Sequence, residues 1–391
     1  MSLDLDRATW QRVPFGDVVR NVNETVKDAA AVNIDRVIAM EHMDRGELDI
    51  TRWGDVADGT TFTRRVRPGQ TLFGKRRAYQ RKVAYAEFEA ICSGDIYTFE
   101  ADENRLLGGL LPFLVQSDPF FDHALNTSAG SLSPRTNWRD LARFEFDLPP
   151  LGEQKRIANS IWAIERHRLA LATQATLIRE LIGIVSVERL DTLPDKMRLG
   201  DLATTRSGPS FAASDVHDRP VEGAVPVLGI PNTKPDGTVD LDGVGYVTNL
   251  ATSVGKIDET SLVLIRTNGN RGRIGNVYLP PFEAHGHAVS AFQFLMQVND
   301  PSDREFLYCV LNEPGMQQRM SDGASGSVGL GNLAVRWLNE QQVPWSIEPE
   351  DRLALVNEVR LLNDAVNSVD RERTALAILR SRIQEEVFGG N

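Results

Sequence analysis

The chain has 391 residues, of which 41% are hydrophobic and 25% are charged, and its formal net charge at pH 7 is -11. This length and composition exclude a disordered chain and predict two or three globular domains with ordinary cores. The acidic balance works against a bulk electrostatic grip on nucleic acid or on an anionic membrane, so any surface for nucleic acid must be local.

The sequence predicts a cytoplasmic protein without membrane contact. No uninterrupted apolar run reaches the roughly 18 residues needed to span a bilayer, and residues 1–10 lack the basic start and the apolar stretch of a signal peptide. Cys92 and Cys309 are too few for a disulfide framework or a cysteine zinc cage, and we expect both to be small buried hydrophobes. No metal site is predicted.

The first half opens with Phe15-Gly16-Asp17 and contains the most basic segment of the chain. Between residues 62 and 82 there are eight basic residues and no acidic one, namely Arg64, Arg65, Arg67, Lys75, Arg76, Arg77, Arg81 and Lys82. Such a segment suits DNA phosphates, and arginine can also bind a guanine edge. The alternative is a solvated basic strand pair balanced by acidic flanks such as residues 41–58. Arg135, in a polar turn, is a smaller candidate.

A long helix is predicted from residue 150 to residue 190. Pro149-Pro150 and Glu153 suit a helix N-terminus, and only Gly183 interrupts the helix formers that follow. Steps of four and three from Ile157 define a seam that is apolar at eight of nine positions: Ile157, Ile161, Ile164, Arg168, Leu171, Ala175, Ile178, Ile182 and Val185. A seam this narrow is typical of a coiled coil.

The second half repeats the plan of the first. Leu199-Gly200-Asp201 opens it, and the tetrapeptide at 324–327 echoes the one at 128–131. A second long helix is predicted from 350 to 388, with a seam apolar at eight of ten positions: Leu355, Val359, Leu362, Val366, Val369, Arg373, Leu376, Arg380, Ile383 and Val387. We expect the two helices to pair antiparallel, like a hairpin with a domain inserted at its bend. The alternative is that each helix lies on its own globular domain.

The second half also has a polar segment at the place that matches the basic segment of the first. Residues 265–275 include Arg266, Asn268, Asn270, Arg271 and Arg273. Asparagine can pair with adenine, and glycine lets a loop approach a groove closely, although a plain Asn-Gly hairpin turn explains much of the same string. A polar turn with Asn232 and Lys234 is a smaller candidate for DNA contact.

The duplicated plan and the junction Pro-Pro-Leu-Gly-Glu-Gln-Lys-Arg-Ile-Ala at 149–158 resemble the DNA-specificity subunit of type I restriction-modification systems over nearly the whole chain. The resemblance implies an α+β fold with target-recognition domains at 11–148 and 196–347, and antiparallel coiled-coil spacer helices within 149–190 and 348–391. Each domain would read half of a bipartite, asymmetric site in double-stranded DNA.

The resemblance further implies that the helices set the spacing of the half-sites and dock DNA methyltransferase subunits. The residues that would serve these roles are Glu153, Gln154, Arg156, Ile157, Ile161, Ile164, Leu171, Ile178, Leu355, Val359, Leu362, Val366, Leu376 and Ile383. No catalytic centre or cofactor is implied for this chain, since S-adenosylmethionine and ATP with Mg²⁺ belong to partner methyltransferase and restriction-translocase subunits. The second junction, at 343–351, lacks the Glu-Gln-Lys core.

Other functions stay open at this stage. The acidic balance is compatible with the specificity module of a related phage-defence or solitary modification system. A two-domain scaffold that binds proteins without DNA contact is a further alternative. An enzyme that itself methylates or cuts DNA ranks behind both, because the phosphate-binding and methyltransferase motifs are absent from the sequence.

Overall fold

A computed structural model of the chain describes residues 5–130, 133–326 and 330–389. Residues 1–4, together with Ser131 and Ser327 of the two echoed tetrapeptides, lie outside the described residues. The chain divides into two compact units: unit 1 comprises Met1–Ala172 and Arg371–Asn391, and unit 2 comprises Thr173–Asp370. Each unit therefore contains a globular part and one segment of each long helix.

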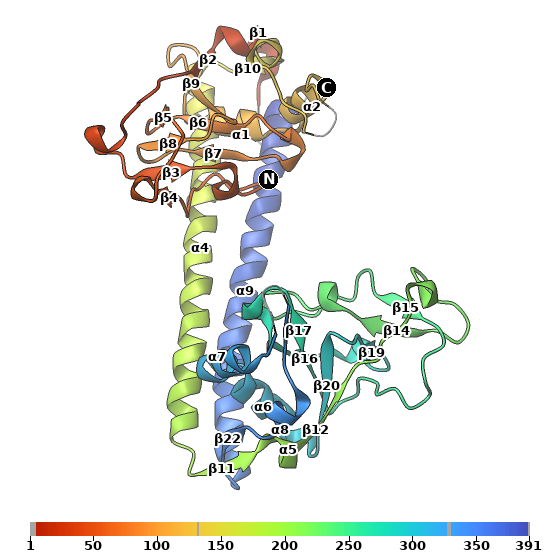
Figure 1. Cartoon of the computed structure of the whole chain (residues 1–391). Helices are drawn as coiled ribbons and strands as arrows, with labels where there is room; N and C mark the ends of the chain where they lie inside the picture. The colour runs from red at the N-terminus through yellow and green to blue at the C-terminus, as the bar shows by residue number, and fades with distance from the viewer. Residues whose placement is uncertain (1–4, 131–132, 327–329, 390–391) are drawn as a thin grey trace. The chain divides into compact units, whose positions relative to one another are not determined.

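The two predicted long helices are present as α4 (Leu151–Asp191) and α9 (Pro349–Phe388) (Figure 1). Glu153 lies in the first turn of α4, and Glu350 and Asp351 lie in the first turn of α9. Carboxylates are favourable there because the helix dipole is positive at the N-terminus, and proline at the first position of α9 has no N–H to leave unsatisfied.

The globular part of unit 1 combines two four-stranded sheets with three short helices. Its strands are β1 (Gln11–Pro14), β2 (Val19–Val22), β3 (Arg36–Ile38), β4 (Gly54–Asp55), β5 (Arg64–Val66), β6 (Thr71–Gly74), β7 (Val83–Tyr85), β8 (Ala90–Cys92), β9 (Ile96–Ala101) and β10 (Glu145–Leu148), and its helices are α1 (Leu111–Gln116), α2 (Asp118–Asn126) and α3 (Trp138–Leu141). The sheets have the orders β2-β9-β6-β7 and β4-β3-β8-β5, and β1 pairs with β10. Phe73, Phe99 and Phe120 form an aromatic core that also includes Ile157 of α4 and Ile383 of α9.

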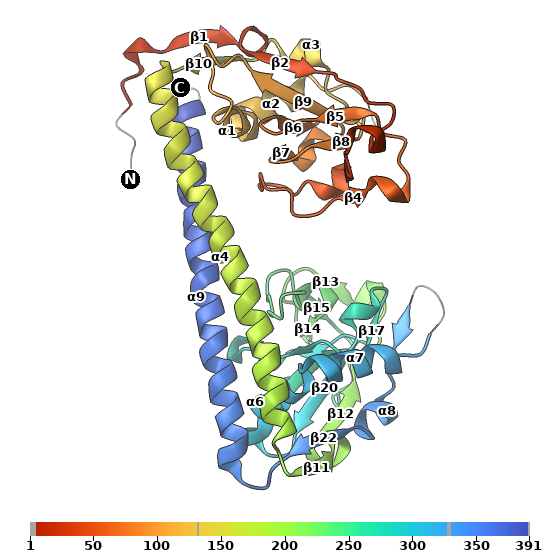
Figure 2. The ribbon, with the colours of Figure 1, turned by 90° about the vertical axis from the view of Figure 1, so that its left-hand side faces the viewer.

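Unit 2 has the same kinds of element. Its strands are β11 (Asp195–Arg198), β12 (Ala203–Ser207), β13 (Val216–His217), β14 (Val225–Leu228), β15 (Gly245–Val247), β16 (Ser261–Ile265), β17 (Thr267–Asn268), β18 (Val277–Tyr278), β19 (Ala288–Val289), β20 (Gln293–Val298), β21 (Gly331–Asn332) and β22 (Gln342–Trp345), and its helices are α5 (Leu199–Leu202), α6 (Arg304–Leu311), α7 (Pro314–Gly323) and α8 (Val335–Asn339). The sheets have the orders β12-β20-β16-β18 and β13-β15-β14-β19, with the pairs β11-β22 and β17-β21. Figure 2 shows the sheet with β13, β14 and β15 apart from the sheet with β12 and β20.

The strand pairing confirms the duplication predicted from the sequence. The sheet β2-β9-β6-β7 corresponds to β12-β20-β16-β18, and the pair β1-β10 corresponds to β11-β22. In the other sheet of each unit one parallel contact recurs, β3 with β8 and β14 with β19. The sheets are not identical, since β5 pairs with β8 in unit 1, whereas β13 joins β15 in unit 2.

The repeated Gly-Asp near the start of each half has a packing explanation. A Cβ added at Gly16 would lie 2.7 Å from the Cβ of Ala142, just after α3, and a Cβ added at Gly200 would lie 3.0 Å from the Cβ of Asn339 in α8. Only glycine allows this close approach, because these separations are shorter than ordinary van der Waals contact. The same motif therefore packs the start of each half against its short helix.

Within each unit the segments of α4 and α9 run antiparallel. In unit 1 Glu165 pairs with Arg380, and His167 Nε2 lies 3.4 Å from Glu372 Oε1. In unit 2 the pairs are Arg179 with Asp370, at 2.7 Å, and Arg189 with Glu358. In both units the residue number rises along α4 while it falls along α9, so the predicted antiparallel pairing is confirmed.

By length and composition alone, α4 could also cross a membrane. Arg179 and Glu180 interrupt its apolar run, which is why the sequence predicted no span. One such helix is a weak indication, because a core helix of a water-soluble protein passes the same test. In this chain the helix has a seam, including Leu171 and Ala175, that is buried within the two units.

Candidate nucleic-acid interface

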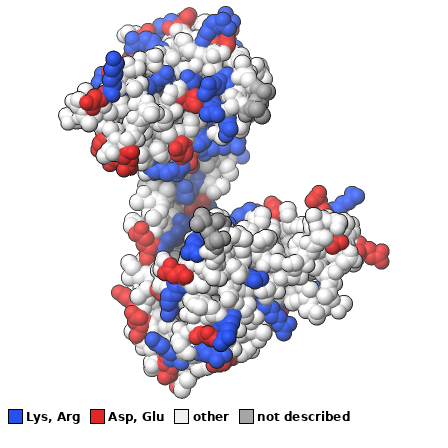
Figure 3. All heavy atoms as spheres, in the orientation of Figure 1, with Lys and Arg blue, Asp and Glu red and all other residues white. Residues whose placement is uncertain are grey.

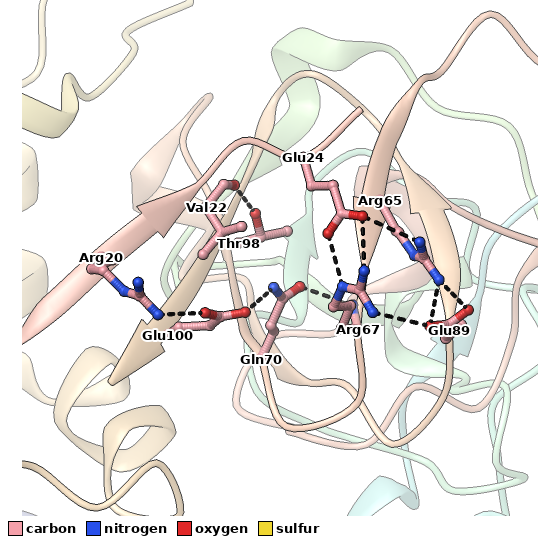
Figure 4. A network of polar contacts seen from close by, with 9 residues as sticks. All are labelled: Arg20, Val22, Glu24, Arg65, Arg67, Gln70, Glu89, Thr98 and Glu100. Carbon is pink, nitrogen blue, oxygen red and sulfur yellow. Dashed lines mark hydrogen bonds and ion pairs between the residues drawn. The ribbon is translucent and has the colours of Figure 1, made fainter. Parts of the chain in front are cut away.

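Two arginines of the basic segment are bound by acidic residues of unit 1 (Figure 4). Arg65 contacts Glu24 at 3.2 Å and Glu89 at 2.8 Å, and Arg67 donates two hydrogen bonds to Glu24, at 2.8 and 2.9 Å. The hydrogen bond from Arg67 holds the pKa of Glu24 below its usual value. Acidic residues therefore neutralise Arg65 and Arg67, as the alternative interpretation of the basic segment predicted. These acids are Glu24 and Glu89, however, and not residues 41–58.

Three further basic residues of the segment bind within the protein. Arg64 donates a hydrogen bond to the carbonyl of Ile96, Arg81 pairs with Asp118, and Lys82 Nζ donates to the carbonyl of Met40 at 2.6 Å. Five of the eight basic residues therefore stabilise the fold of unit 1. The other three, Lys75, Arg76 and Arg77, follow β6 consecutively.

These three residues form a paired loop with Arg135. Arg77 N donates to the carbonyl of Pro134 at 2.8 Å, Thr136 N donates to the carbonyl of Lys75 at 2.9 Å, and Ala129 and Arg135 exchange two backbone hydrogen bonds. We call residues 75–77 and 133–136 platform 1. The structure thus brings together two predicted candidates that lie about sixty residues apart in the sequence.

Platform 1 carries excess positive charge. Arg135 and Arg76 share one carboxylate, Asp95, at 3.1 and 3.5 Å, and the Lys75 ammonium lies 5.0 Å from the centre of the Tyr97 ring. Burial, reinforced by neighbouring arginines, lowers the pKa of Lys75. Arg77 is exposed and makes no ion pair among the described residues. Its φ of 55° is left-handed, a strained conformation for arginine that clusters at functional sites.

The same backbone framework occurs in unit 2. Leu333 N donates to the carbonyl of Arg266 at 2.9 Å, as Thr136 N does to Lys75, and Ser325 and Asn332 exchange two hydrogen bonds, as Ala129 and Arg135 do. We call residues 266–268 and 330–333 platform 2. Its two strands are β17 and β21, and Thr267 Oγ1 donates to Asn332 Oδ1 at 2.7 Å.

Two arginines of residues 265–275 hold loops of unit 2. Arg271 donates to the carbonyl of Ala324 at 3.1 Å, and Arg273 donates to the carbonyl of Thr233 and, at 3.0 Å, to the hydroxyl of Tyr278. Arg266 lies with its guanidinium 5.6 Å from the centre of the Phe294 ring.

Asparagine amides are the accessible polar groups beside these arginines. Asn268 Oδ1 accepts from Asn270 N at 2.8 Å, and Asn270 Oδ1 accepts from Gly272 N at 3.0 Å. Each amide is thus fixed through its oxygen. The NH₂ group of each amide has no acceptor among residues 5–130, 133–326 and 330–389, and is available as a donor.

The smaller candidates Asn232 and Lys234 stabilise a turn of unit 2. Asn232 is 5% exposed and donates to the carbonyls of Asp240 and Asp242 at 3.0 and 3.2 Å. Lys234 Nζ lies 3.0 Å from Asp240 Oδ2. Burial makes Asn232 unsuitable for reading a base edge, so the structure favours the ordinary polar turn at this place.

The junction residues fix unit 1 to the start of α4. Gln154 is 1% exposed, accepts from Leu107 N at 2.8 Å and donates to the carbonyls of Arg105 and Pro149, each at 2.8 Å. Glu153 accepts from Trp10 Nε1 at 2.8 Å and lies 3.4 Å from Arg156. At the second junction a different contact joins the start of α9 to unit 2: Arg352 forms an ion pair with Asp303 at 2.8 Å.

The predicted seam residues lie in the helix pair as expected. Those that are fully buried are Ile157, Ile161, Leu171, Leu355, Val359, Val366 and Ile383, and those that are half-buried are Ile164, Ile178, Leu362 and Leu376.

The polar seam positions Arg168 and Arg380 converge on Glu165, which the seam pattern did not single out. Asp95 and Asn332 were also missed as members of the platforms. The echoed tetrapeptides beside the platforms were the one signal that could have drawn attention to these loops.

The surface charge of each unit is mixed. Lys and Arg lie interspersed with Asp and Glu on the visible face of each unit (Figure 3). Among residues 5–130, 133–326 and 330–389, no group of three His, Cys, Asp or Glu side chains could hold a metal ion. Cys92 and Cys309 are buried free thiols, as predicted.

The fold defines a class: a duplicated α+β protein in which each repeat carries one long helix and one platform of paired polar loops. Two solved structures share this fold over the chain. One, described as a basis for complex assembly and conformational transition of the type I R-M system, covers 98% of each chain with a TM-score of 0.57 and 15% identity. The other, the type I restriction-modification S subunit from M. genitalium, covers 100% of each chain with a TM-score of 0.56 and 14% identity.

The chain therefore has the fold of type I restriction-modification specificity subunits, and the resemblance predicted from the sequence is confirmed. It is also similar in sequence to the type I restriction enzyme EcoDI specificity subunit of Escherichia coli, at 32% identity over 95 residues. That match covers 24% of this chain and 20% of the length of that relative. No protein-family model matches the chain.

Proposed function

We propose that this chain is the DNA-specificity subunit of a type I restriction-modification complex. Its target-recognition regions are residues 11–148 and 196–347, and each reads half of a bipartite, asymmetric site in double-stranded DNA. The chain is non-catalytic and works in the cytoplasm as part of a heteromeric complex. DNA methyltransferase and restriction-translocase subunits supply the S-adenosylmethionine and ATP chemistry.

One observation carries this proposal: the same hydrogen-bonded pair of polar loops occurs in both repeats of a fold shared with specificity subunits. Two equivalent platforms are what a reader of two half-sites needs. Arg76, Arg77 and Arg135 suit phosphate contact and base-edge readout, because arginine provides a fixed fork of N–H donors.

The helix pair supports the proposed docking of partner subunits. In the unit 2 segment of α4, Leu177, Leu181 and Ile184 share one helical face and are 59%, 43% and 55% exposed, and Leu361 of α9 is 71% exposed. Leu181 and Leu361 line the same groove between the two helices. A clustered apolar surface of this kind is typical of a protein-protein contact.

DNA binding by the full chain, alone and with its methyltransferase subunits, tests the proposal. Replacing Arg77 and Arg135 with alanine is expected to weaken binding and to flatten its salt dependence, because two positive charges are removed from platform 1. The matched control replaces Arg65 and Arg67, which are bound by Glu24 and Glu89. The salt dependence of DNA binding should change less in this control variant than in the variant of Arg77 and Arg135.

Either of two results would contradict this assignment. A complex that shows no salt-dependent binding to any duplex would favour a protein-binding scaffold. A larger effect from the control pair than from Arg77 and Arg135 would move the interface from platform 1 to strand β5.

The partner surface has a separate test. Replacing Leu177, Leu181 and Leu361 with serine should abolish co-purification with the methyltransferase subunit while leaving the thermal stability of the chain unchanged. Phe282, which is 79% exposed and lies outside α4 and α9 in the sequence of unit 2, provides the matched apolar control. Normal assembly of the triple variant would exclude this face as the docking site.

A further inference from the structure

The two platforms have the same backbone framework but different side-chain chemistry. The shared hydrogen bonds align Lys75 with Arg266, Arg76 with Thr267, Arg77 with Asn268 and Arg135 with Asn332. Platform 1 therefore presents guanidinium groups where platform 2 presents a hydroxyl and two amides. This difference lies at positions that the framework makes equivalent.

These two chemistries favour different bases. Arginine forms two parallel hydrogen bonds to O6 and N7 of guanine, whereas asparagine pairs with N6 and N7 of adenine. We propose that platform 1 reads guanine in its half-site through Arg77 and Arg135. Platform 2 then reads adenine in the other half-site through Asn268 and Asn332. This assignment rests on the proposed function.

The contacts of platform 1 leave its arginine donors accessible. The Arg135 side chain is 57% exposed and forms one ion pair with the residues that the structure describes, to Asp95 at 3.1 Å, so most of its five N–H donors have no partner there. Arg76 competes for the same carboxylate, which keeps the platform positive. Asp95 thus orients the two guanidinium groups without neutralising them. Arg77 follows Arg76 in the chain and has a left-handed backbone, with a φ of 55°.

The contacts of platform 2 orient its amides. Asn332 Oδ1 accepts from Thr267 Oγ1 at 2.7 Å, and Asn268 Oδ1 accepts from the backbone of Asn270 at 2.8 Å. A carbonyl oxygen has two lone pairs, so each amide can still accept from adenine N6 while its NH₂ group donates to N7. Because the amide planes are already fixed by the loop, little side-chain entropy is lost on binding.

None of the three arginines in residues 265–275 occupies a platform 2 position that aligns with Arg77 or Arg135. Arg271 and Arg273 hold carbonyl groups of their own unit, and Arg266 is half-buried beside Phe294. The equivalent loops of the two units therefore differ both in the residue type they carry and in which groups are committed to the fold.

Selection of duplexes from a random pool by the assembled complex tests this assignment. The wild-type complex should enrich a bipartite sequence with guanine in one half and adenine in the other. Arg135→Lys keeps the charge but loses the planar fork. It should retain the salt slope of non-specific binding while guanine discrimination in one half falls about 5- to 150-fold. Asn268→Ala should relax an adenine position in the other half only.

The outcomes separate the two proposals. If no duplex is enriched, the proposed function itself fails, and the base assignment falls with it. If a bipartite sequence is enriched but Arg135→Lys leaves every guanine position unchanged, the function stands and the base assignment is overturned. Arg77→Lys provides a second variant of platform 1 in case Arg135→Lys perturbs the Asp95 contact. Circular dichroism and thermal melting establish that each variant is folded.

Discussion

Replacing Glu165 with alanine is expected to destabilise unit 1 by about 3–5 kcal/mol, the usual cost of breaking a buried ion pair by removing one partner. Glu165, Arg168 and Arg380 are 9%, 8% and 7% exposed. Arg168 Nη1 donates to both oxygens of Glu165, at 3.1 and 3.0 Å, and Arg380 donates to the same carboxylate. Without Glu165, two guanidinium groups would share the helix seam with no charge between them.

The two arginines have other contacts that bound this estimate. Arg168 Nη2 reaches Glu47 at 2.9 Å, and Arg380 Nη2 donates to the carbonyl of Gly46 at 2.8 Å. These contacts tie the loop at 46–47 to both helices, and they keep each guanidinium partly satisfied in the variant. The loss should therefore fall near the lower end of the range.

Urea denaturation read by hydrogen exchange of peptides from residues 151–172 measures this loss within unit 1. Glu372→Ala, which removes an exposed pair with His167, is the control and should cost no more than about 1 kcal/mol. A triple variant with leucine at 165 and 168 and methionine at 380 should recover most of the stability, because apolar residues of similar volume can replace a buried ion network. Equal losses in Glu165→Ala and Glu372→Ala would refute the reasoning.

Three further predictions concern the junction, the acid response and the thiols. Gln154→Leu should lower the free energy of unfolding in urea by more than about 2 kcal/mol, since it leaves the N–H of Leu107 and the carbonyls of Arg105 and Pro149 without their partner. A change below roughly 0.5 kcal/mol, the usual size of the effect at surface sites, would argue against the junction role. Arg67 lowers the pKa of Glu24, so the contribution of Glu24 to the stability of the fold is fully present above about pH 4.3, the pKa of an unfolded glutamate, and is lost as the pH falls through the folded-state pKa. Glu24→Gln should be less stable than wild type at neutral pH and equally stable in acid. A difference in stability that stays constant from neutral pH into acid would contradict the pairing. Burial raises the pKa of Cys92 and Cys309 to about 12, so iodoacetamide at pH 8 should modify both thiols in urea but neither in the folded chain. Mass spectrometry measures the labelling, and rapid labelling of the folded chain would contradict the burial of these thiols.

The sequence by itself determined the long helices, their pairing and the duplication. These features depend on patterns that the chain carries locally. The steps of four and three along α4 and α9 place apolar residues on one helical face, and such a face needs a partner whatever the rest of the fold is. Gly16 and Gly200 repeat because the same close contact recurs in each unit.

Only the tertiary structure decided what each polar residue does. Arg65, Arg67 and Arg77 belong to one basic segment, yet the first two are bound by Glu24 and Glu89, whereas Arg77 is exposed on platform 1. Charge composition gives the number of arginines but not their partners, which come from distant parts of the chain.

The same reason explains the seam. Arg168 and Arg380 interrupt its apolar pattern, and their common partner Glu165 becomes visible only when the two helices lie side by side in unit 1. Periodicity predicts which face of a helix is buried because it depends on residues three and four apart. The pairing of buried charges depends on residues brought together by folding, so it cannot be read from either helix alone.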